Sequence, residues 1–467
     1  MGLAGLPLEL LTRVLQCLQG DTFSLRSALL VNKKWSAEAV RVLWENPSPD
    51  DLAAISDINK RQFYARYIRE LEINGSEWLH HEAFQTLKFP RLRSVLIDAT
   101  DSDENEEQEE AWIGQYIQPA LEVFKCYATA PAGDEDVLQL LETRCRRLRT
   151  MIIGAKLQGL SSASLSGFID RCKSLRSLGV VDGRRGPIDG RVLSSLASHD
   201  GLVELEVSPF LKHEMFVNTF QDVDRPFKGI QKLQLNIEPK TVPLLVPKIK
   251  NIRLLSLTLA DGDISPWPHL SSLTKLRDLT IEYHESAELS VNDFQALKKL
   301  GLNRLNVRGI YGDIIAPTLT DDKFIPVIET QPALREIWLE IRASLTVQSL
   351  ISLGQECREL QDCFLPGTYD LSPLMDIDPE PPLFPCLEQL TIGAISEIPP
   401  RPWPSIDSTS DKAKCLAQAI LKHAPNLEGL ITMGVDDEFS ETVRATIEEL
   451  KETTPGLPPS PPPGDEH

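Results

Sequence analysis

The chain has 467 residues, of which 42% are apolar, and its 68 acidic side chains outnumber 48 basic ones, giving a formal net charge of −20. A single compact core rarely grows to this length, so the size predicts several domains or a repeat array. The acidic balance argues against nucleic acid or an anionic membrane surface as the main partner. It favours a basic partner, although net acidity can also simply keep a long protein in solution.

The sequence shows no targeting or catalytic signal. Glu9 and Arg13 interrupt the apolar residues of the amino terminus, and no uncharged segment approaches the roughly 18 residues of a membrane helix. The eight cysteines form no CxxC pair, which favours reduced structural thiols, with small buried groups at Cys145, Cys172 and Cys357. Without a Gly-rich phosphate loop, an HExxH or a GxSxG motif, we expect no catalytic residue, metal or cofactor. The sequence predicts a soluble non-enzyme of the cytoplasm, the nucleus or both.

Residues 1–46 have a wholly helical pattern. Pro7 suits the first turn of a helix, which an apolar stripe then continues: Leu10, Leu11, Val14, Leu15 and Leu18. Thr22 or Ser24 can cap a second helix, and Ser36 can cap a third. Three helices of this size are marginal as an isolated fold, so we expect a partner protein to complete their core. Residues 47–67 are expected to form a helical linker.

From residue 68 onward a six-residue phrase recurs, with a large aliphatic side chain at its first position and apolar residues at its fourth and usually its sixth. Fourteen copies begin at Ile68, Leu92, Leu121, Leu148, Leu175, Leu202, Ile230, Ile252, Leu276, Leu302, Leu334, Leu360, Leu387 and Leu427. The copies at Leu360 and Leu427 are weaker, with Cys363 and Thr432 at apolar positions. The mean spacing of about 28 residues is that of leucine-rich repeats.

A short strand that points these positions inward cannot bury them alone, so neighbouring copies must stack. The sequence therefore predicts an α/β fold, in which residues 68–451 form a right-handed leucine-rich-repeat solenoid, a horseshoe with a parallel concave sheet. Helical patterns at 134–145, 162–172 and 346–357 suit its convex side. The short intervals around Ile252 and Leu276 predict turns in place of full helices.

Three segments depart from the repeat pattern. Residues 101–110 hold seven acidic side chains and predict a solvated loop. Residues 396–411 are rich in proline and serine and predict an irregular loop. The end of the chain, 452–467, carries six prolines between residues 455 and 463 and is expected to be a disordered tail.

Because side chains alternate along a strand, the residues that lie two, four and six places after each phrase start are expected on the concave face. The candidate target-binding residues there are Arg304, Arg308, Trp338, Glu340 and Phe364. The expected register sets Arg304 between Asp278 and Glu336, and Arg308 between Glu282 and Glu340, with strands about 4.8 Å apart. One interpretation is a self-satisfied charge ladder that orders the sheet. The other is a binding site, because aromatics beside arginine are typical of interface hot spots and four acids against two bases favour a cationic segment.

The segment from Leu6 to Trp44 resembles an F-box. The positions that carry the resemblance are Leu6-Pro7, Glu9, the apolar stripe through Leu18, Leu25, Leu30-Val31, Lys34-Trp35 and Leu43-Trp44. Asn32 stands where many members have cysteine or serine. An F-box followed by leucine-rich repeats is a recurrent arrangement of substrate-receptor subunits in Skp–cullin–F-box ubiquitin ligases.

The resemblance implies a non-catalytic receptor that takes part in ubiquitin-dependent protein degradation. Residues 1–46 would dock on a Skp-type adaptor, which carries the cullin and RING subunits, while the repeats bind a protein target. The expected adaptor-facing residues are Leu6, Pro7, Leu10, Val14, Leu18, Leu25, Leu29 and Val31. Some of these, Val14 and Leu29 above all, can instead hold the three helices together. Trp35 and Trp44 are expected in internal packing or at the seam to the first repeat.

Two other functions fit the same residues. An F-box protein can bind the adaptor as a scaffold without ubiquitin transfer. Alternatively, the chain is a repeat-only regulator that binds another protein, and Leu6 to Trp44 is merely an end cap.

Overall fold

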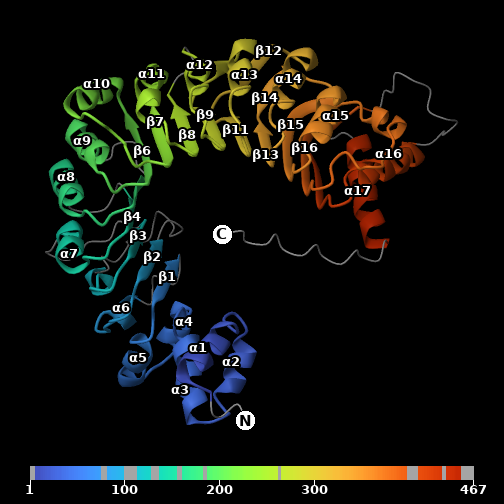
Figure 1. The fold of residues 1–467 in the computed structure, drawn as a ribbon. Helices are drawn as coiled ribbons and strands as arrows, with labels where there is room; N and C mark the ends of the chain where they lie inside the picture. Colours follow the sequence, from blue (N-terminus) through green and yellow to red (C-terminus); the bar gives the residue numbers. More distant parts are fainter. Residues whose placement is uncertain are drawn as a thin grey trace. The chain divides into compact units, whose positions relative to one another are not determined.

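The structure, a computed structural model, describes residues 6–74, 81–98, 113–127, 136–154, 160–181, 187–260, 264–396, 409–433 and 438–453. The chain folds as two compact units, Met1–Ile230 (unit 1) and Gln231–His467 (unit 2), which Figure 1 traces. The acidic loop expected at 101–110 lies outside the described residues. So do residues 397–408 of the expected loop 396–411 and the tail from residue 454.

Unit 1 begins with a module of three helices, α1 (Leu8–Gln16), α2 (Thr22–Ala28) and α3 (Lys33–Leu43). We call residues 6–46 the three-helix module. Its core consists of six buried side chains, with Leu18, Leu29, Trp35 and Leu43 packed against them: Leu11, Leu15, Leu25, Ala28, Ala39 and Val42. Of the apolar stripe seen in the sequence, Leu11 and Leu15 face this core and Leu18 packs against it, whereas Leu10 and Val14 are exposed.

The expected helix caps were wrong by one to four residues. Asp21 caps α2 by accepting a hydrogen bond from the Ser24 amide, and Asn32 caps α3 by accepting from the Lys34 and Trp35 amides. Asp and Asn cap helices as well as Ser does, so the cap that lies earlier in the chain starts the helix first. Ser36 therefore lies inside α3.

A seam joins the three-helix module to the first strand of unit 1. The Glu45 carbonyl accepts hydrogen bonds from the Arg69 and Glu70 amides at 2.8 and 3.1 Å, just as the Arg69 carbonyl accepts from the next strand. The Glu45 carboxylate is buried and pairs with Arg69 at 3.4 Å. The Trp44 ring stacks on Tyr64, with centroids 4.3 Å apart. The end of α3 thus takes the place of a preceding repeat, as expected for Trp44 at the seam.

The rest of unit 1 alternates strands and helices. Helices α4 (Pro49–Ala53) and α5 (Ile58–Ala65) connect the three-helix module to a parallel sheet. Its strands follow chain order: β1 (Glu70–Asn74), β2 (Ser94–Asp98), β3 (Val123–Cys126), β4 (Thr150–Gly154), β5 (Ser177–Val181) and β6 (Glu204–Leu211). The connecting helices lie together on one side of the sheet (Figure 1): α6 (His81–Phe84), α7 (Val137–Arg144), α8 (Ser162–Arg171), α9 (Gly190–Ser198) and α10 (His213–Asp222).

Unit 2 continues the same alternation. Its parallel strands are β7 (Lys232–Ile237), β8 (Leu254–Leu259), β9 (Asp278–Tyr283), β11 (Arg304–Gly309), β13 (Glu336–Leu339), β15 (Asp362–Tyr369), β16 (Gln389–Ile395) and β17 (Gly429–Thr432). Its helices are α11 (Val242–Leu245), α12 (Trp267–Leu270), α13 (Val291–Leu297), α14 (Asp321–Ile328), α15 (Val347–Glu356), α16 (Thr409–His423) and α17 (Glu438–Thr453). The four-residue helices α11 and α12 confirm that the shortest intervals hold turns. Helix α16 begins inside the segment expected to be an irregular loop.

The phrase predicts the sheet strand by strand. Each of the fourteen described strands of the long parallel sheet begins two residues after a phrase start, including those of the weaker copies at Leu360 and Leu427. The inward positions are buried, as in Leu175, Leu178 and Val180. The α/β fold with a long parallel sheet, the arrangement of a leucine-rich-repeat solenoid, is therefore confirmed.

A second sheet in unit 2 was not predicted. It contains three short parallel strands, β10 (Ala287–Glu288), β12 (Ile314–Thr320) and β14 (Ile341–Ser344). They lie in the connections that follow three successive strands of the main sheet. Buried Ala287, Ile314 and Ile341 anchor them, but two to seven residues carry too short an alternation to separate a strand from a loop.

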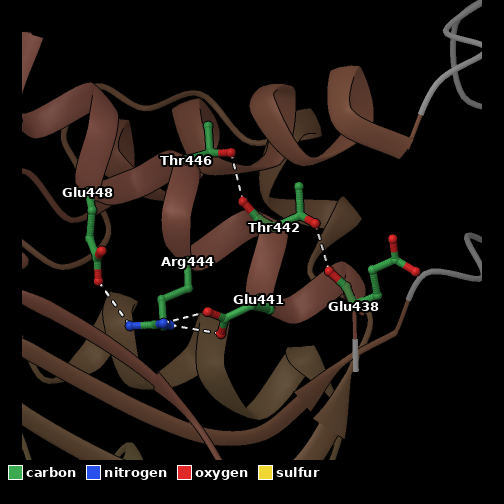
Figure 2. Close-up of polar contacts among 6 residues, drawn as sticks. All are labelled: Glu438, Glu441, Thr442, Arg444, Thr446 and Glu448. Carbon is green, nitrogen blue, oxygen red and sulfur yellow. Dashed lines mark hydrogen bonds and ion pairs between the residues drawn. The ribbon is translucent and has the colours of Figure 1, made fainter. Parts of the chain in front are cut away.

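Helix α17 covers the last strand of unit 2. Its inner face buries Phe439, Val443 and Ile447. On its outer face Arg444 bonds to Glu441 and Glu448, each at 3.0 Å, as Figure 2 shows. An apolar inner face with a polar outer face is what the end of a repeat array requires. The helix ends at Thr453, two residues beyond the expected end of the array.

Candidate functional site

On the strand face of unit 2, three of the four acidic neighbours predicted for Arg304 and Arg308 lie opposite them in the strand register. Arg304 lies opposite Asp278 on β9 and Glu336 on β13, and Arg308 lies opposite Glu282. The fourth neighbour, Glu340, stays a prediction: β13 ends at Leu339, and the Glu340 amide that follows donates a hydrogen bond to the Val307 carbonyl at 2.8 Å. The Glu340 side chain is exposed.

Two ion pairs cross these strands. The Arg304 Nη2 and Glu336 Oε1 atoms are 2.9 Å apart, and the Arg308 Nε donates to Glu282 Oε1 at 2.7 Å. Both arginines are at least half exposed, so pairs of this kind stabilise the fold by only about 0–1 kcal/mol each. Burial raises the pKa of Asp278, against the opposing effect of Arg304. The predicted charge ladder is therefore present, but its exposed ion pairs contribute little stability, so the same residues remain candidates for target binding.

Two aromatic side chains lie in the next row of the same face. The rings of Trp338 and Phe364 stack with centroids 4.1 Å apart and an interplanar angle of 7°. Trp338 is 43% exposed, whereas Phe364 is only 4% exposed. The expectation that both present surface to a target was therefore wrong for Phe364, because the tryptophan ring lies flat against it. Trp338 is thus the exposed ring, and Phe364 is the buried ring that supports it.

A cavity of about 250 Å³ opens beside this aromatic pair. We call it the unit 2 cavity, and its lining comes from four neighbouring strands: Arg304, Leu305, Asn306, Glu336, Ile337, Trp338, Asp362, Cys363, Phe364, Gln389 and Thr391. Among the described residues, the Asp362 carboxylate has no ion-pair partner and the buried Asn306 Oδ1 has no hydrogen-bond donor. The sequence analysis did not single out these two residues, although the alternation rule that selected Arg304 and Trp338 also points to them.

The three-helix module exposes a second candidate surface. Six large apolar side chains on it are 44–88% exposed: Leu8, Leu10, Val14, Phe23, Leu30 and Val31. Soluble proteins seldom expose so many large apolar side chains on so small a domain, which favours an interaction surface. We call these six residues the apolar patch of the module.

The expected adaptor-facing residues divide into three groups. Pro7, Leu10, Val14 and Val31 are exposed, and Leu6, Leu18 and Leu29 are half-buried. Leu25 is buried in the core of the module, so its expected contact role does not fit its position. Phe23 and Leu30 are 80% and 88% exposed, but neither belongs to the expected adaptor-facing set. Leu30 was named only among the positions that carry the F-box resemblance, and Phe23, which lies on no regular apolar stripe, was not singled out.

Two of the three cysteines expected as small buried groups, Cys145 and Cys357, are buried, whereas Cys172 is half-buried. Burial raises the pKa of the Cys145 and Cys357 thiols to about 12. Cys145 donates a hydrogen bond to the Gln118 carbonyl at 3.2 Å, and Cys357 donates to the Gln331 carbonyl at 3.3 Å, each in the preceding repeat. They close the turn between helix and strand, as expected from their position before the phrase.

Comparison with known proteins adds no family. No family model matches the sequence, and no curated protein matches it at a significant level. Within the part of the chain that the structure describes, no helix has the length and hydropathy needed to cross a bilayer. In the same residues, no group of three or more His, Cys, Asp or Glu side chains is placed to hold a metal ion. The two surfaces themselves must carry the functional argument.

Proposed function

We propose that this protein is the target-binding subunit of a Skp–cullin–F-box ubiquitin ligase. Residues 1–46 form the F-box and dock on a Skp-type adaptor, and the strand face of unit 2 binds a protein target. The observation that carries the proposal is the apolar patch of the module, in which Phe23 and Leu30 are 80% and 88% exposed.

The physical argument compares the patch with the core beneath it. Six buried side chains, two of them alanines, hold three helices together. A core of this size gives little stability by itself. Six exposed large apolar side chains cost further free energy in water until a partner covers them. A helical adaptor that contributes its own apolar side chains would complete this interior.

The mechanism that follows is positioning. The protein supplies no catalytic group; it would hold a target lysine near the ubiquitin-charged enzyme and so raise its effective concentration. The seam supports this role within unit 1, because the Glu45 carbonyl continues the backbone ladder of the strands at 2.8 Å. A flexible joint there would lower the effective concentration that the receptor gains.

One observation favours the alternative of a repeat-only regulator. The same ladder at Glu45 makes the three-helix module an end cap of the array. An end cap, however, needs a polar outer face. Helix α17 has one, with Arg444 between Glu441 and Glu448, whereas the module exposes its apolar patch. This contrast favours a binding module over a simple cap.

Capture of a Skp-type adaptor tests the proposal. Phe23→Ser and Leu30→Ser alter the two most exposed residues of the patch, so the module should still fold. We expect the double variant to lose the adaptor by roughly 100-fold in affinity, because interface anchors of this size each contribute about 1–2 kcal/mol or more. Leu244→Ser, a change at an exposed leucine of unit 2, is the matched control and should leave capture intact.

The outcomes separate the candidate functions. Recovery of the cullin with the adaptor supports the ligase receptor, whereas adaptor without cullin supports a scaffold. If the wild-type chain does not bind the adaptor, or if the double variant binds as well as wild type, the F-box assignment is wrong.

A further inference from the structure

The unit 2 cavity has the size of a site for one side chain. Its volume is about 250 Å³, below the range of roughly 300–1,000 Å³ that is usual for small-molecule pockets. It opens on the strand face, where a polypeptide can approach. Its occupant is therefore best sought among the side chains of a protein target.

The aromatic wall of the unit 2 cavity suits a planar cation. Trp338 is held flat against Phe364 at 4.1 Å, which fixes the orientation of its ring, and it remains 43% exposed. A guanidinium group stacks on an aromatic face through both its charge and its plane. An aliphatic side chain would use the apolar wall alone.

The carboxylates around the cavity outnumber the cations. Glu336 and Asp362 are register partners on β13 and β15, so two acids stand side by side. Like charges placed opposite each other are unfavourable. Arg304 approaches this pair from one side only, with its Nη2 2.9 Å from Glu336, and Asp278 across the strand adds a third acid. Asp362 has no ion pair among the described residues, which leaves a place for one positive charge.

The hydrogen-bonding groups favour arginine over lysine. A guanidinium has five N–H donors in a rigid fork, which can serve a carboxylate and a neighbouring acceptor together. Glu336 and Asp362, register partners in the cavity lining, offer carboxylate oxygens to more than one of these donors, whereas a lysine ammonium acts as a point charge.

We propose that the unit 2 cavity binds one arginine side chain of an extended segment of the target, an assignment that rests on the proposed role of this face in target binding. The guanidinium stacks on Trp338 and bonds to Asp362, while the aliphatic part of the side chain covers the apolar wall. Specificity for a basic segment then comes from a defined pocket in place of the net charge of the whole protein.

Binding of short peptides to the purified full-length protein tests the pocket. The probes are acetylated pentapeptide amides, Gly-Gly-X-Gly-Gly, in which X is arginine, citrulline, lysine or glutamate, measured by titration calorimetry and by tryptophan fluorescence. Citrulline keeps the shape of arginine but not its charge. We expect the arginine peptide to bind at least 10-fold more tightly than the citrulline and lysine peptides, and the glutamate peptide not to bind.

Three variants locate the site. Asp362→Asn keeps the volume and removes the charge, and Trp338→Ala removes the stacking surface; each should weaken the arginine peptide at least 10-fold. Glu288→Gln, which alters an exposed acid on β10, is the matched control and should bind as wild type does. Circular dichroism checks that each variant is folded. If Trp338→Ala does not fold, Asp362→Asn alone tests the pocket.

The same preparations are scored for adaptor capture, so that the two proposals fail separately. The assignment of arginine to the pocket is overturned if arginine and citrulline peptides bind equally, if lysine binds as well as arginine, if Asp362→Asn binds as wild type does, or if no peptide binds. Adaptor capture that persists in those cases leaves the receptor function standing. Peptide binding without adaptor capture would support the arginine pocket and contradict the proposed role in a ubiquitin ligase.

Discussion

The three-helix module and the strand face of unit 2 both expose large apolar side chains, but for different physical reasons. In the module, Phe23 and Leu30 project from a core of six buried side chains. In unit 2, Trp338 stands on Phe364 above an interior that every repeat extends. We therefore expect the module, whose core is small, to gain stability from a partner. We expect the unit 2 face, whose interior is complete, to use a partner only to fill its cavity.

The largest expected effect comes from removing core from each region. Leu15 in α1 and Leu279 in β9 are both fully buried. Alanine at either position costs about 2–5 kcal/mol. We expect Leu15→Ala to unfold residues 6–46, because few other buried side chains support them, whereas Leu279→Ala should leave unit 2 folded. Limited proteolysis with mass mapping measures the difference, and equal resistance of residues 6–46 in wild type and Leu15→Ala would break the comparison.

A smaller loss of stability is expected from neutralising either of two glutamates that pair with arginine. Glu45 at the seam is 6% exposed, while Glu336 in unit 2 shares an exposed pair with Arg304. We expect Glu45→Gln to lower the free energy of unfolding by about 1–3 kcal/mol, since it removes the buried carboxylate charge that pairs with Arg69. Glu336→Gln is the matched change and should cost about 0–1 kcal/mol. Hydrogen exchange of β1 and β13 measures each effect locally, and a larger loss at Glu336 would contradict the account.

A pH effect tests the burial of the charge ladder in unit 2. Burial raises the pKa of Asp278 above its ordinary 3.8, so the folded chain holds this proton at higher pH than the unfolded chain. The favourable contribution of Asp278 to stability is therefore present below pH 3.8 and is lost as the pH rises through the folded pKa. Asp278→Asn should remove this decline. Denaturant unfolding at several pH values measures it; an unchanged pH profile in the variant would show that Asp278 is not the group responsible.

The smallest expected change is chemical labelling of thiols. Cys17 is exposed at the end of α1, one turn beyond Val14, whereas the Cys145 and Cys357 thiols, with pKa values near 12, stay protonated at pH 8. Iodoacetamide should alkylate Cys17 well before the other two. Because Cys17 shares a helical face with Leu10 and Val14, the adaptor should slow its alkylation. Unchanged labelling in the presence of bound adaptor would place the interface elsewhere on the module.

Periodicity predicts the fold better than it predicts surfaces. The phrase located the fourteen described strands of the long parallel sheet, because every copy buries its first and fourth positions and all but the last also bury the sixth. Short strands such as β10 have no such requirement, so their sequence looks like a loop. The helix caps were misplaced for a related reason, since Asn32 and Ser36 are equally suitable caps and only the folded chain chooses between them.

The candidate sites were predicted in part. Strand register placed Arg304 beside Glu336, because register follows directly from the phrase. Burial of Phe364 could not be predicted, because it depends on how the Trp338 ring turns. In the module, the exposure of Leu30 and the burial of Leu25 depend on where α2 ends, which propensity defines only to within a few residues.

Hydrogen exchange of the full-length protein with and without a Skp-type adaptor tests the central claim most directly. The account predicts that amides of α1, α2 and α3 exchange at least 10-fold more slowly when the adaptor is bound, while the strands of unit 2 keep their rates. If the three helices are already as protected as the strands in the free protein, and if the adaptor leaves their exchange unchanged, then the module is complete by itself and the proposed function is wrong.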